Sequence, residues 1–176
     1  WKTYEPESVE QMARWIDEHP DGLVLDLGCA VGIFTALALH GSRHVDVIAF
    51  DADAASLRVT RRVGDVAANP ARLRLVHGLI SDQHRTGGSL ASAIQTTART
   101  LAATAHESAT ETTRYVCIED PGRAELPEYT LDGLFAETPA TSRPTLLKCD
   151  VEGAEFLVLR GARQWLARIR PTLLLS

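Results

Sequence analysis

The stretch VLDLGCAVGIFTALA, Val24 to Ala38, decides the fold. Its apolar start is typical of a strand, and two glycines four positions apart, Gly28 and Gly32, then open a helix. A dinucleotide fingerprint would need a third glycine, and a phosphate-binding P-loop would need Lys followed by Ser or Thr after the second one. The pattern D-x-G-x-x-x-G, which begins at Asp26, instead favours a ligand with an ammonium or sulfonium group, such as S-adenosylmethionine.

Strand and helix patterns alternate on both sides of this stretch. Helices are predicted at Pro6–Glu18, Gly32–His40, Asp53 to about Val66 and Gly153–Ala167, and strands at Leu23–Leu27, Val45–Phe50, Arg72–Ile80, Thr145–Asp150 and Thr172–Leu175. Such alternation predicts an α/β fold, with a doubly wound, mainly parallel sheet and helices on both faces. The binding crevice is expected at the carboxyl ends of the strands.

Residues 81–113 interrupt this rhythm with many Thr, Ala, Ser and Gly residues. Three apolar residues could form one thin seam of a helix there: Leu90, Ile94 and Leu101. The weak pattern favours a poorly ordered surface insertion, and the alternative is a lid that closes over a substrate. An extra strand is then expected at Arg114–Asp120, followed by a short helix capped by Asp132. The 176 residues are predicted to form one domain with this insertion or lid.

Composition limits the functions that the chain can serve. A formal net charge of -5 argues against nucleic acid as the main partner. Cys29, Cys117 and Cys149 form no CxxC pair, so neither a disulfide framework nor a zinc site is indicated. No apolar run of membrane-spanning length and no signal segment is present, so a cytoplasmic protein without membrane association is expected. The start at Trp1 and the end inside a strand pattern suggest a piece of a longer protein.

Acids and hydroxyls follow the second and third predicted strands. Asp51 falls 19 residues after Gly32, where a carboxylate can accept hydrogen bonds from both hydroxyls of a ribose. Dinucleotide folds place an acid there too, so Asp51 alone does not separate the two kinds of ligand. Ser81 and Asp82 could bond the edge of an adenine, and the alternative for Asp82 is a turn or cap residue.

The order and spacing of several motifs resemble the FkbM-type class I methyltransferases. They are YEPESVEQMARWI, VLDLGCAVGIFT, VIAFDADAASLRV, RLRLVHGLISD, YTLDGLF and LLKCDVEGAEFLVLRGA. The resemblance implies a Rossmann-like fold, S-adenosylmethionine as the methyl donor, and O-methylation of a sugar or natural product. By position it places Asp26, Gly28 and Gly32 along the methionine part, Asp51 at the ribose, and Ser81 with Asp82 at the adenine. Cys29 and Ala52 complete the predicted donor-binding set.

The chain departs from the pattern of that family at three places. Ala30 stands where the family usually has Asn, and Asp51-Ala52 where it usually has Glu-Pro. Ser176 stands where a Glu is common. The closing strands of the family's sheet are expected to be missing from this sequence.

The segment DVEGAE is the candidate for catalysis. Asp150 is predicted at a strand tip, with Glu152 and Glu155 at the start of the next helix. One of these carboxylates could act as a general base on an acceptor hydroxyl, or the cluster could hold a divalent cation, although no metal site is expected. Acids in a first helical turn also stabilise a helix without any catalysis. Lys148 shares a strand face with Asp150 and would neutralise it.

The sequence thus predicts an S-adenosylmethionine-dependent O-methyltransferase that acts on a small hydroxylated molecule. Two alternatives stay open: a nicotinamide-dependent oxidoreductase, and a degenerate methyltransferase-like domain that binds without turnover. The acceptor and the oligomeric state are not specified by any motif.

Overall fold

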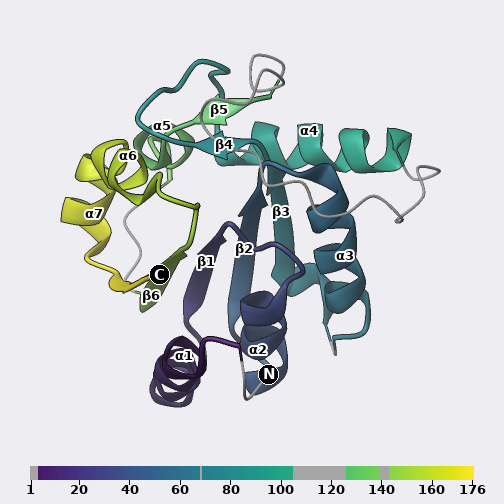
Figure 1. Ribbon diagram of the computed structural model, residues 1–176, viewed down its shortest axis with the longest axis vertical. Helices are drawn as coiled ribbons and strands as arrows, with labels where there is room; N and C mark the ends of the chain where they lie inside the picture. The colour runs from purple at the N-terminus through teal and green to yellow at the C-terminus, as the bar shows by residue number, and fades with distance from the viewer. Residues whose placement is uncertain (1–3, 68, 105–125, 139–142) are drawn as a thin grey trace.

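Five parallel strands form the central sheet of the computed structural model, which describes residues 4–67, 69–104, 126–138 and 143–176. The strands are β1 (Leu23–Leu27), β2 (Asp46–Asp51), β3 (Leu73–His77), β6 (Thr145–Cys149) and β7 (Thr172–Leu175). Their order in space is β3-β2-β1-β6-β7 (Figure 1). The chain therefore runs outward from β1 to β3 and then returns to the other side of β1. This reversal places the topological switch point between β1 and β6, where α/β sheets form their crevices.

Helices cover both faces of this sheet. The elements on one face are α1 (Pro6–Glu18), α2 (Ile33–Gly41) and α3 (Ala54–Asp65), and those on the other are α5 (Leu131–Leu134), α6 (Glu155–Arg160) and α7 (Arg163–Ile169). Alternate strand residues enter the two apolar clusters: Val24 and Leu146 pack with α1 and α2, while Leu25 and Leu147 pack with α5 and α7. The predicted doubly wound α/β fold is confirmed.

Local signals place the helix starts where the sequence predicts them. Pro6 occupies the first turn of α1, where its missing N–H is no loss. The Asp53 carboxylate accepts hydrogen bonds from the backbone N–H groups of Ala55 and Ser56 and so caps α3. The helix predicted from Asp53 to about Val66 is confirmed.

The helix predicted from Gly153 to Ala167 is wrong as a single element, because the chain breaks between α6 and α7 at Gly161. A Cβ atom at Gly161 would overlap the backbone carbonyl oxygen of Ser81, so the break lies where two segments pack closely. The start of α7 is capped from elsewhere, since the Asp132 carboxylate accepts the N–H groups of Gln164 and Trp165. Asp132 thus does not cap its own short helix α5.

The short helices α5 and α6 follow from local contacts. The cap of α5 is Thr130, whose hydroxyl accepts the N–H of Gly133. Phe156 on α6 is 71% exposed. The cause is the shortness of α6, which buries only Val158 among its residues.

The predicted third strand is split in two at Gly78, which adopts a positive φ of 146°. Beyond this glycine, β4 (Leu79–Ile80) leaves the main sheet and pairs in parallel with β5 (Glu128–Tyr129). This small second sheet lies beyond the end of β3 (Figure 1). Ser81 and Asp82 follow β4 and therefore belong to this second sheet rather than to the tip of β3.

The segment expected to be a poorly ordered insertion contains a helix, α4 (Leu90–Ala103), which packs against β3. Its apolar seam is confirmed, because Ala93 and Leu101 are buried and Leu90 and Ile94 pack against the core. The Thr97 hydroxyl also accepts the backbone N–H of His77, 2.7 Å away. The expectation of little order is therefore wrong for α4, while residues 105–113 and the strand predicted at 114–120 lie outside the described residues. The lid stays a prediction.

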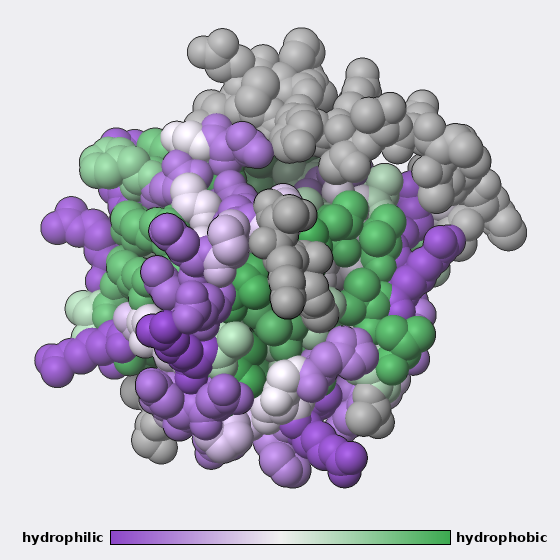
Figure 2. All heavy atoms as spheres, turned by 60° about the horizontal axis from the view of Figure 1, so that its bottom comes forward, coloured by the Kyte–Doolittle hydropathy of each residue, from purple (hydrophilic) through white to green (hydrophobic). Residues whose placement is uncertain are grey.

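Apolar residues also reach the surface, and on the face drawn in Figure 2 they form patches between polar and charged residues. The exposed large apolar side chains are Tyr4, Val31, Val59, Val66, Phe156, Leu173 and Leu175. Three of them, Tyr4, Val31 and Phe156, belong to segments that border the ends of β1 and β6. Over the ranges that the structure describes, no helix is both long and apolar enough to cross a membrane.

Candidate active site

The turn after β1 curls back toward β2. The backbone N–H groups of Gly28 and Cys29 both donate to the carbonyl oxygen of Phe50, at 3.0 Å each. Gly28, Ala30 and Gly32 all adopt positive φ angles, of 72°, 46° and 80°. This left-handed backbone directs the N–H of Ala30 at the end of β2.

Packing against the protein itself explains why two positions of this turn are glycine. A Cβ atom at Gly28 would overlap the carbonyl oxygen of Asp150, and one at Gly32 would lie 2.9 Å from the Thr60 hydroxyl oxygen. Both Cβ positions therefore face protein atoms. Gly28 lets the turn after β1 lie directly on the end of β6.

Asp51, at the end of β2, is oriented by backbone groups on both of its oxygens. Oδ2 accepts the N–H of Ala30 and Oδ1 the N–H of Asp53, each at 2.8 Å. Burial raises the pKa of Asp51, although these two N–H groups lower it. A carboxylate has about four lone-pair directions, so Asp51 keeps acceptor capacity for a ligand.

Cys29 and Ala52, the two small residues of the predicted donor set, take part in contacts beside Asp51. The buried Cys29 thiol lies 3.9 Å from Asp51 Oδ2, and burial raises its pKa well above the ordinary value, which keeps it protonated. The Ala52 carbonyl oxygen lies 3.0 Å from Nε2 of His77, whose pKa is lowered by burial. A neutral His77 therefore donates to Ala52 and fixes the backbone next to Asp51.

Asp26 lies inside the protein rather than at the rim of the crevice. Asp26 is 0% exposed, and it lies directly opposite Lys148 in the parallel register of β1 and β6. Oδ2 accepts the Thr35 hydroxyl at 2.7 Å, and Oδ1 lies 3.5 Å from Lys148 Nζ. The carboxylate is therefore enclosed by protein groups.

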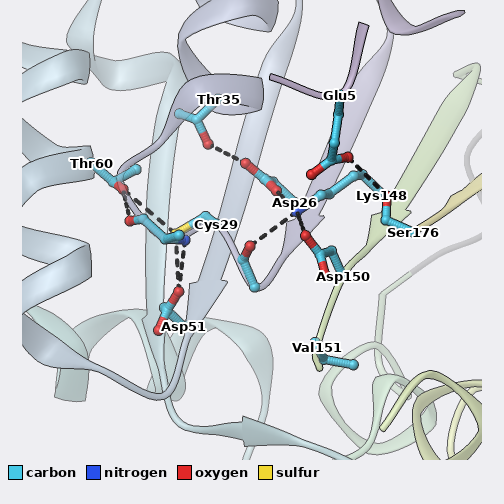
Figure 3. Close-up of polar contacts among 12 residues, drawn as sticks. Glu5, Asp26, Cys29, Thr35, Asp51, Thr60, Lys148, Asp150, Val151 and Ser176 are labelled. Carbon is cyan, nitrogen blue, oxygen red and sulfur yellow. Dashed lines mark hydrogen bonds and ion pairs between the residues drawn. The ribbon is translucent and has the colours of Figure 1, made fainter. Parts of the chain in front are cut away.

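Lys148 joins the turn after β1 to the end of β6 (Figure 3). Its Nζ donates to the Gly28 carbonyl oxygen at 3.0 Å and lies 3.7 Å from Asp150 Oδ2. Nζ also lies 5.0 Å from the centre of the Phe34 ring. Burial alone would lower the pKa of Lys148, but Asp26 and Asp150 raise it, so the ammonium form is retained. The predicted neutralisation of Asp150 by Lys148 agrees with this geometry.

Asp150 is the acid of this group that reaches solvent, with its side chain 24% exposed. Burial raises its pKa, Lys148 lowers it, and the carboxylates of Glu5 and Glu155 raise it again. Glu5 comes from the residue before α1, and its Oε2 accepts the Ser176 hydroxyl at 3.1 Å (Figure 3). The ends of three elements thus meet around Asp150, which has an elevated proton affinity.

Glu152 and Glu155 differ in their contacts. Glu155 Oε1 accepts the backbone N–H groups of Val151 and Gly153, at 3.0 and 3.2 Å. Partial burial raises the pKa of Glu155, but these hydrogen bonds outweigh it and the net shift is downward. Glu152 is exposed, with a positive φ of 53°. Glu155 therefore closes the turn, while Glu152 projects from it, and the described part of the chain contains no group of three potential metal ligands.

Ser81 and Asp82 both have protein partners. The buried Ser81 hydroxyl donates to Glu128 Oε1 at 2.7 Å, and it accepts the N–H of Gln83 at 2.9 Å. The Asp82 carboxylate forms an ion pair with Arg160 on α6. The first contact connects the end of β4 to β5, and the second connects this small sheet to α6.

A groove of ≈ 410 Å³ lies at the β3 edge of the sheet, between α3 and α4. It is lined by residues such as Arg61, Leu73 and Ile94. None of the predicted site residues lines it, so the candidate active site stands apart from this groove.

A doubly wound parallel sheet, with a glycine turn after β1 and an acid after β2, defines a Rossmann-like α/β domain. A family model described as the methyltransferase FkbM domain matches residues 28–175, and the chain belongs to this FkbM methyltransferase family. The chain is also similar to the X-ray structure of YjhP from E. coli, at 17% identity and a TM-score of 0.37. That alignment covers 56% of this chain and 45% of the other. Comparison with curated proteins gives no match.

Proposed function

We propose that this domain transfers a methyl group from S-adenosylmethionine to a hydroxyl group of a small molecule, such as a sugar or natural product. The supporting observation is the Asp51 carboxylate, held beside the glycine turn by the N–H of Ala30 at 2.8 Å. The turn and the acid stand at the ends of adjacent strands, next to the switch point of the sheet. Membership of the FkbM family supports the same reaction class.

The residues present fit a nucleoside with a positively charged substituent. Asp51 can accept hydrogen bonds from ribose hydroxyls with its remaining lone pairs. The backbone of the turn from Gly28 to Gly32 would lie along the methionine part, and Ser81 with Asp82 would flank the adenine. Asp150, partly exposed at the next strand end, adds negative charge near a sulfonium. S-adenosylmethionine supplies the activated methyl group when bound.

Asp150 is the residue that we assign to the acceptor hydroxyl. Its Oδ atoms can take the hydroxyl proton as the oxygen attacks, because the side chain is partly exposed and ionised beside Lys148. Burial, with the charges of Glu5 and Glu155, raises its pKa, which strengthens it as a base. After transfer the proton passes to water from the exposed side.

The two other acids of the turn support this assignment in different ways. Glu155 holds the turn in place through the N–H groups of Val151 and Gly153. Glu152 projects into solvent beside Asp150 and can contact a polar acceptor. The exposed apolar side chains of Tyr4, Val31 and Phe156 border the same rim and offer a surface for its apolar part.

Calorimetry with S-adenosylmethionine, S-adenosylhomocysteine and NAD, joined to an assay of methyl transfer to hydroxylated acceptors, tests the proposal. We expect both adenosyl ligands to bind and NAD not to bind. NAD binding without adenosyl binding would identify a nicotinamide enzyme instead. Adenosyl binding without transfer to any acceptor would identify a degenerate binding domain.

A further inference from the structure

The buried ammonium group of Lys148 lies where the two halves of the proposed reaction meet. The side chain is 2% exposed. Its Nζ is 3.0 Å from the carbonyl oxygen of Gly28, in the turn assigned to the donor. The same atom is 3.7 Å from Oδ2 of Asp150, which is assigned to the acceptor. One side chain thus contacts both the turn and the acid.

The surroundings of Lys148 match the donors of an ammonium group. Such a group has three N–H donors. Three oxygens lie near Nζ: Asp26 Oδ1 and Gly28 O at the end of β1, and Asp150 Oδ2 at the end of β6. The Phe34 ring adds a cation–π contact from α2. The position of Nζ therefore sets the spacing between the end of β1 and the end of β6.

Asp26 has the features of a buried counter-ion. Its Oδ1 has no hydrogen-bond partner and depends on the nearby ammonium group, while Oδ2 is satisfied by Thr35. A buried ion pair contributes little net stability, since desolvation of two charges offsets their attraction. Placement of the Lys148 ammonium group explains the pair better than stability does. With no exposed surface, Asp26 makes no direct contact with a ligand in this structure, and Lys148 connects it to the turn and to Asp150.

We propose that Lys148 is a positioning residue, which holds the Gly28 carbonyl and the Asp150 carboxylate in one arrangement with Asp26 as its buried counter-ion. The inference rests on the proposed function for the reaction that this arrangement serves. It replaces the direct contact between Asp26 and the donor that the family resemblance implies. The ammonium group also keeps Asp150 ionised, because a cation at this distance favours a carboxylate over a carboxylic acid.

The variants must separate positioning from folding. Lys148→Met alone would leave Asp26 buried and unpaired, which is strongly destabilising. The double variant Asp26→Asn with Lys148→Met removes both charges, keeps similar side-chain volumes, and leaves an acceptor for Thr35. Thr35→Val is the matched control, because it removes the other bond of Asp26 and leaves the contacts of Lys148 intact.

The first measurement is an NMR titration of the Asp150 carboxyl carbon, assigned by its absence in Asp150→Asn. In the double variant we expect the pKa of Asp150 to rise, because Lys148 is the group that lowers it. Thr35→Val should leave that pKa at the parent value. The titration needs no ligand, so it tests Lys148 independently of the proposed reaction.

The second measurement is the affinity for S-adenosylmethionine by calorimetry. The double variant should bind about tenfold more weakly, as expected for a lost charge-assisted hydrogen bond to the donor turn, and Thr35→Val should bind like the parent. A folded double variant with parental affinity and an unchanged Asp150 pKa would overturn the proposal. A parent protein that binds no S-adenosylmethionine would overturn the proposed function, while the titration would still decide the effect of Lys148 on Asp150.

Discussion

The turns that follow β1 and β6 both contain left-handed backbone, yet the acids beside them differ. Each turn contains glycine at positive φ and one other residue in the left-handed region, Ala30 in the first and Glu152 in the second. In the first, the nearby Asp51 carboxylate accepts two backbone N–H groups and is held in one orientation. In the second, Oδ2 of Asp150 lies 3.7 Å from Lys148 Nζ, and the side chain is partly exposed, so its oxygens stay accessible. This difference supports the proposed binding role of Asp51 and the proposed proton transfer to Asp150.

Replacement of the second-turn acid should have the largest effect. Asp150→Asn should lower turnover by roughly 10²–10⁴-fold, with little change in donor affinity, because its proposed work is on the acceptor in the transition state. Steady-state kinetics together with calorimetry measure both quantities. Asp17→Asn, the same change at an exposed position of α1, is the matched control. Turnover near the parental value in Asp150→Asn would make Asp150 a structural residue.

The contact between the two turns gives the next largest effect. Gly28→Ala should lower the free energy of unfolding by about 2–4 kcal/mol, because it adds backbone strain and an overlap with the Asp150 carbonyl. Gly153→Ala also changes a glycine at positive φ, but nothing lies within 4 Å of its Cβ position. Gly153→Ala should therefore lower the free energy of unfolding by only about 1–2 kcal/mol. If urea denaturation showed equal losses of unfolding free energy in the two variants, the turn after β1 would not pack closely against the end of β6.

Local patterns along the chain predicted much of the fold correctly. Neighbouring residues determine the strands β1, β2, β6 and β7 and the helix starts at Pro6 and Asp53. These strands and helix starts lie within about one residue of their predicted places. The helix break at Gly161 depends on close packing against Ser81, and the helical structure of α4 depends on packing against β3. Both partners are distant in the chain. No local pattern contains that information.

The candidate site shows the same difference between features set by local patterns and features set by distant contacts. The sequence places Asp51 and Asp150 at strand ends, because each follows an apolar run. The burial of Asp26 could not be predicted, since it depends on the register that sets Asp26 opposite Lys148 across two strands far apart in the chain. A lysine inside an apolar strand pattern was the available signal that a buried partner exists.

The proposed binding role of Asp51, which ends β2 beside the first turn, can be tested with two ligands. Asp51→Ala should weaken S-adenosylmethionine and S-adenosylhomocysteine together by about tenfold or more, because both share the ribose and a charge-assisted hydrogen bond is lost. Asp51→Asn should be milder, since the amide keeps one acceptor. The binding role is falsified if Asp51→Ala stays folded and binds both ligands as tightly as the parent.

The pH dependence of turnover should distinguish the second turn from the first. The pKa of Asp150 is raised, so the acidic limb of kcat should lie above the pH at which an ordinary Asp titrates. Glu5→Gln removes a negative charge that raises this pKa, and the limb should therefore move to lower pH. Arg14→Gln, an exposed change on α1, serves as the control. If the acidic limb does not move in Glu5→Gln, the charge of Glu5 does not affect the pKa of Asp150.

The smallest expected effect concerns the left-handed residue of each turn. Ala30 has a φ of 46°, where a Cβ atom is unfavourable and Asn is tolerated better than Ala. Ala30→Asn should therefore raise the free energy of unfolding by about 0.5–1 kcal/mol in urea denaturation. The bond from the Ala30 N–H to Asp51 is a backbone bond, so donor affinity should not fall. Glu152→Asn is the matched change in the second turn, at a φ of 53°, and should stabilise the protein similarly. Ala30→Val should do the opposite, because a β-branched side chain fits this region least. If Ala30→Asn and Ala30→Val had the same stability, the turn after β1 would not hold residue 30 in the left-handed conformation, and the N–H of this residue would not be fixed on Asp51.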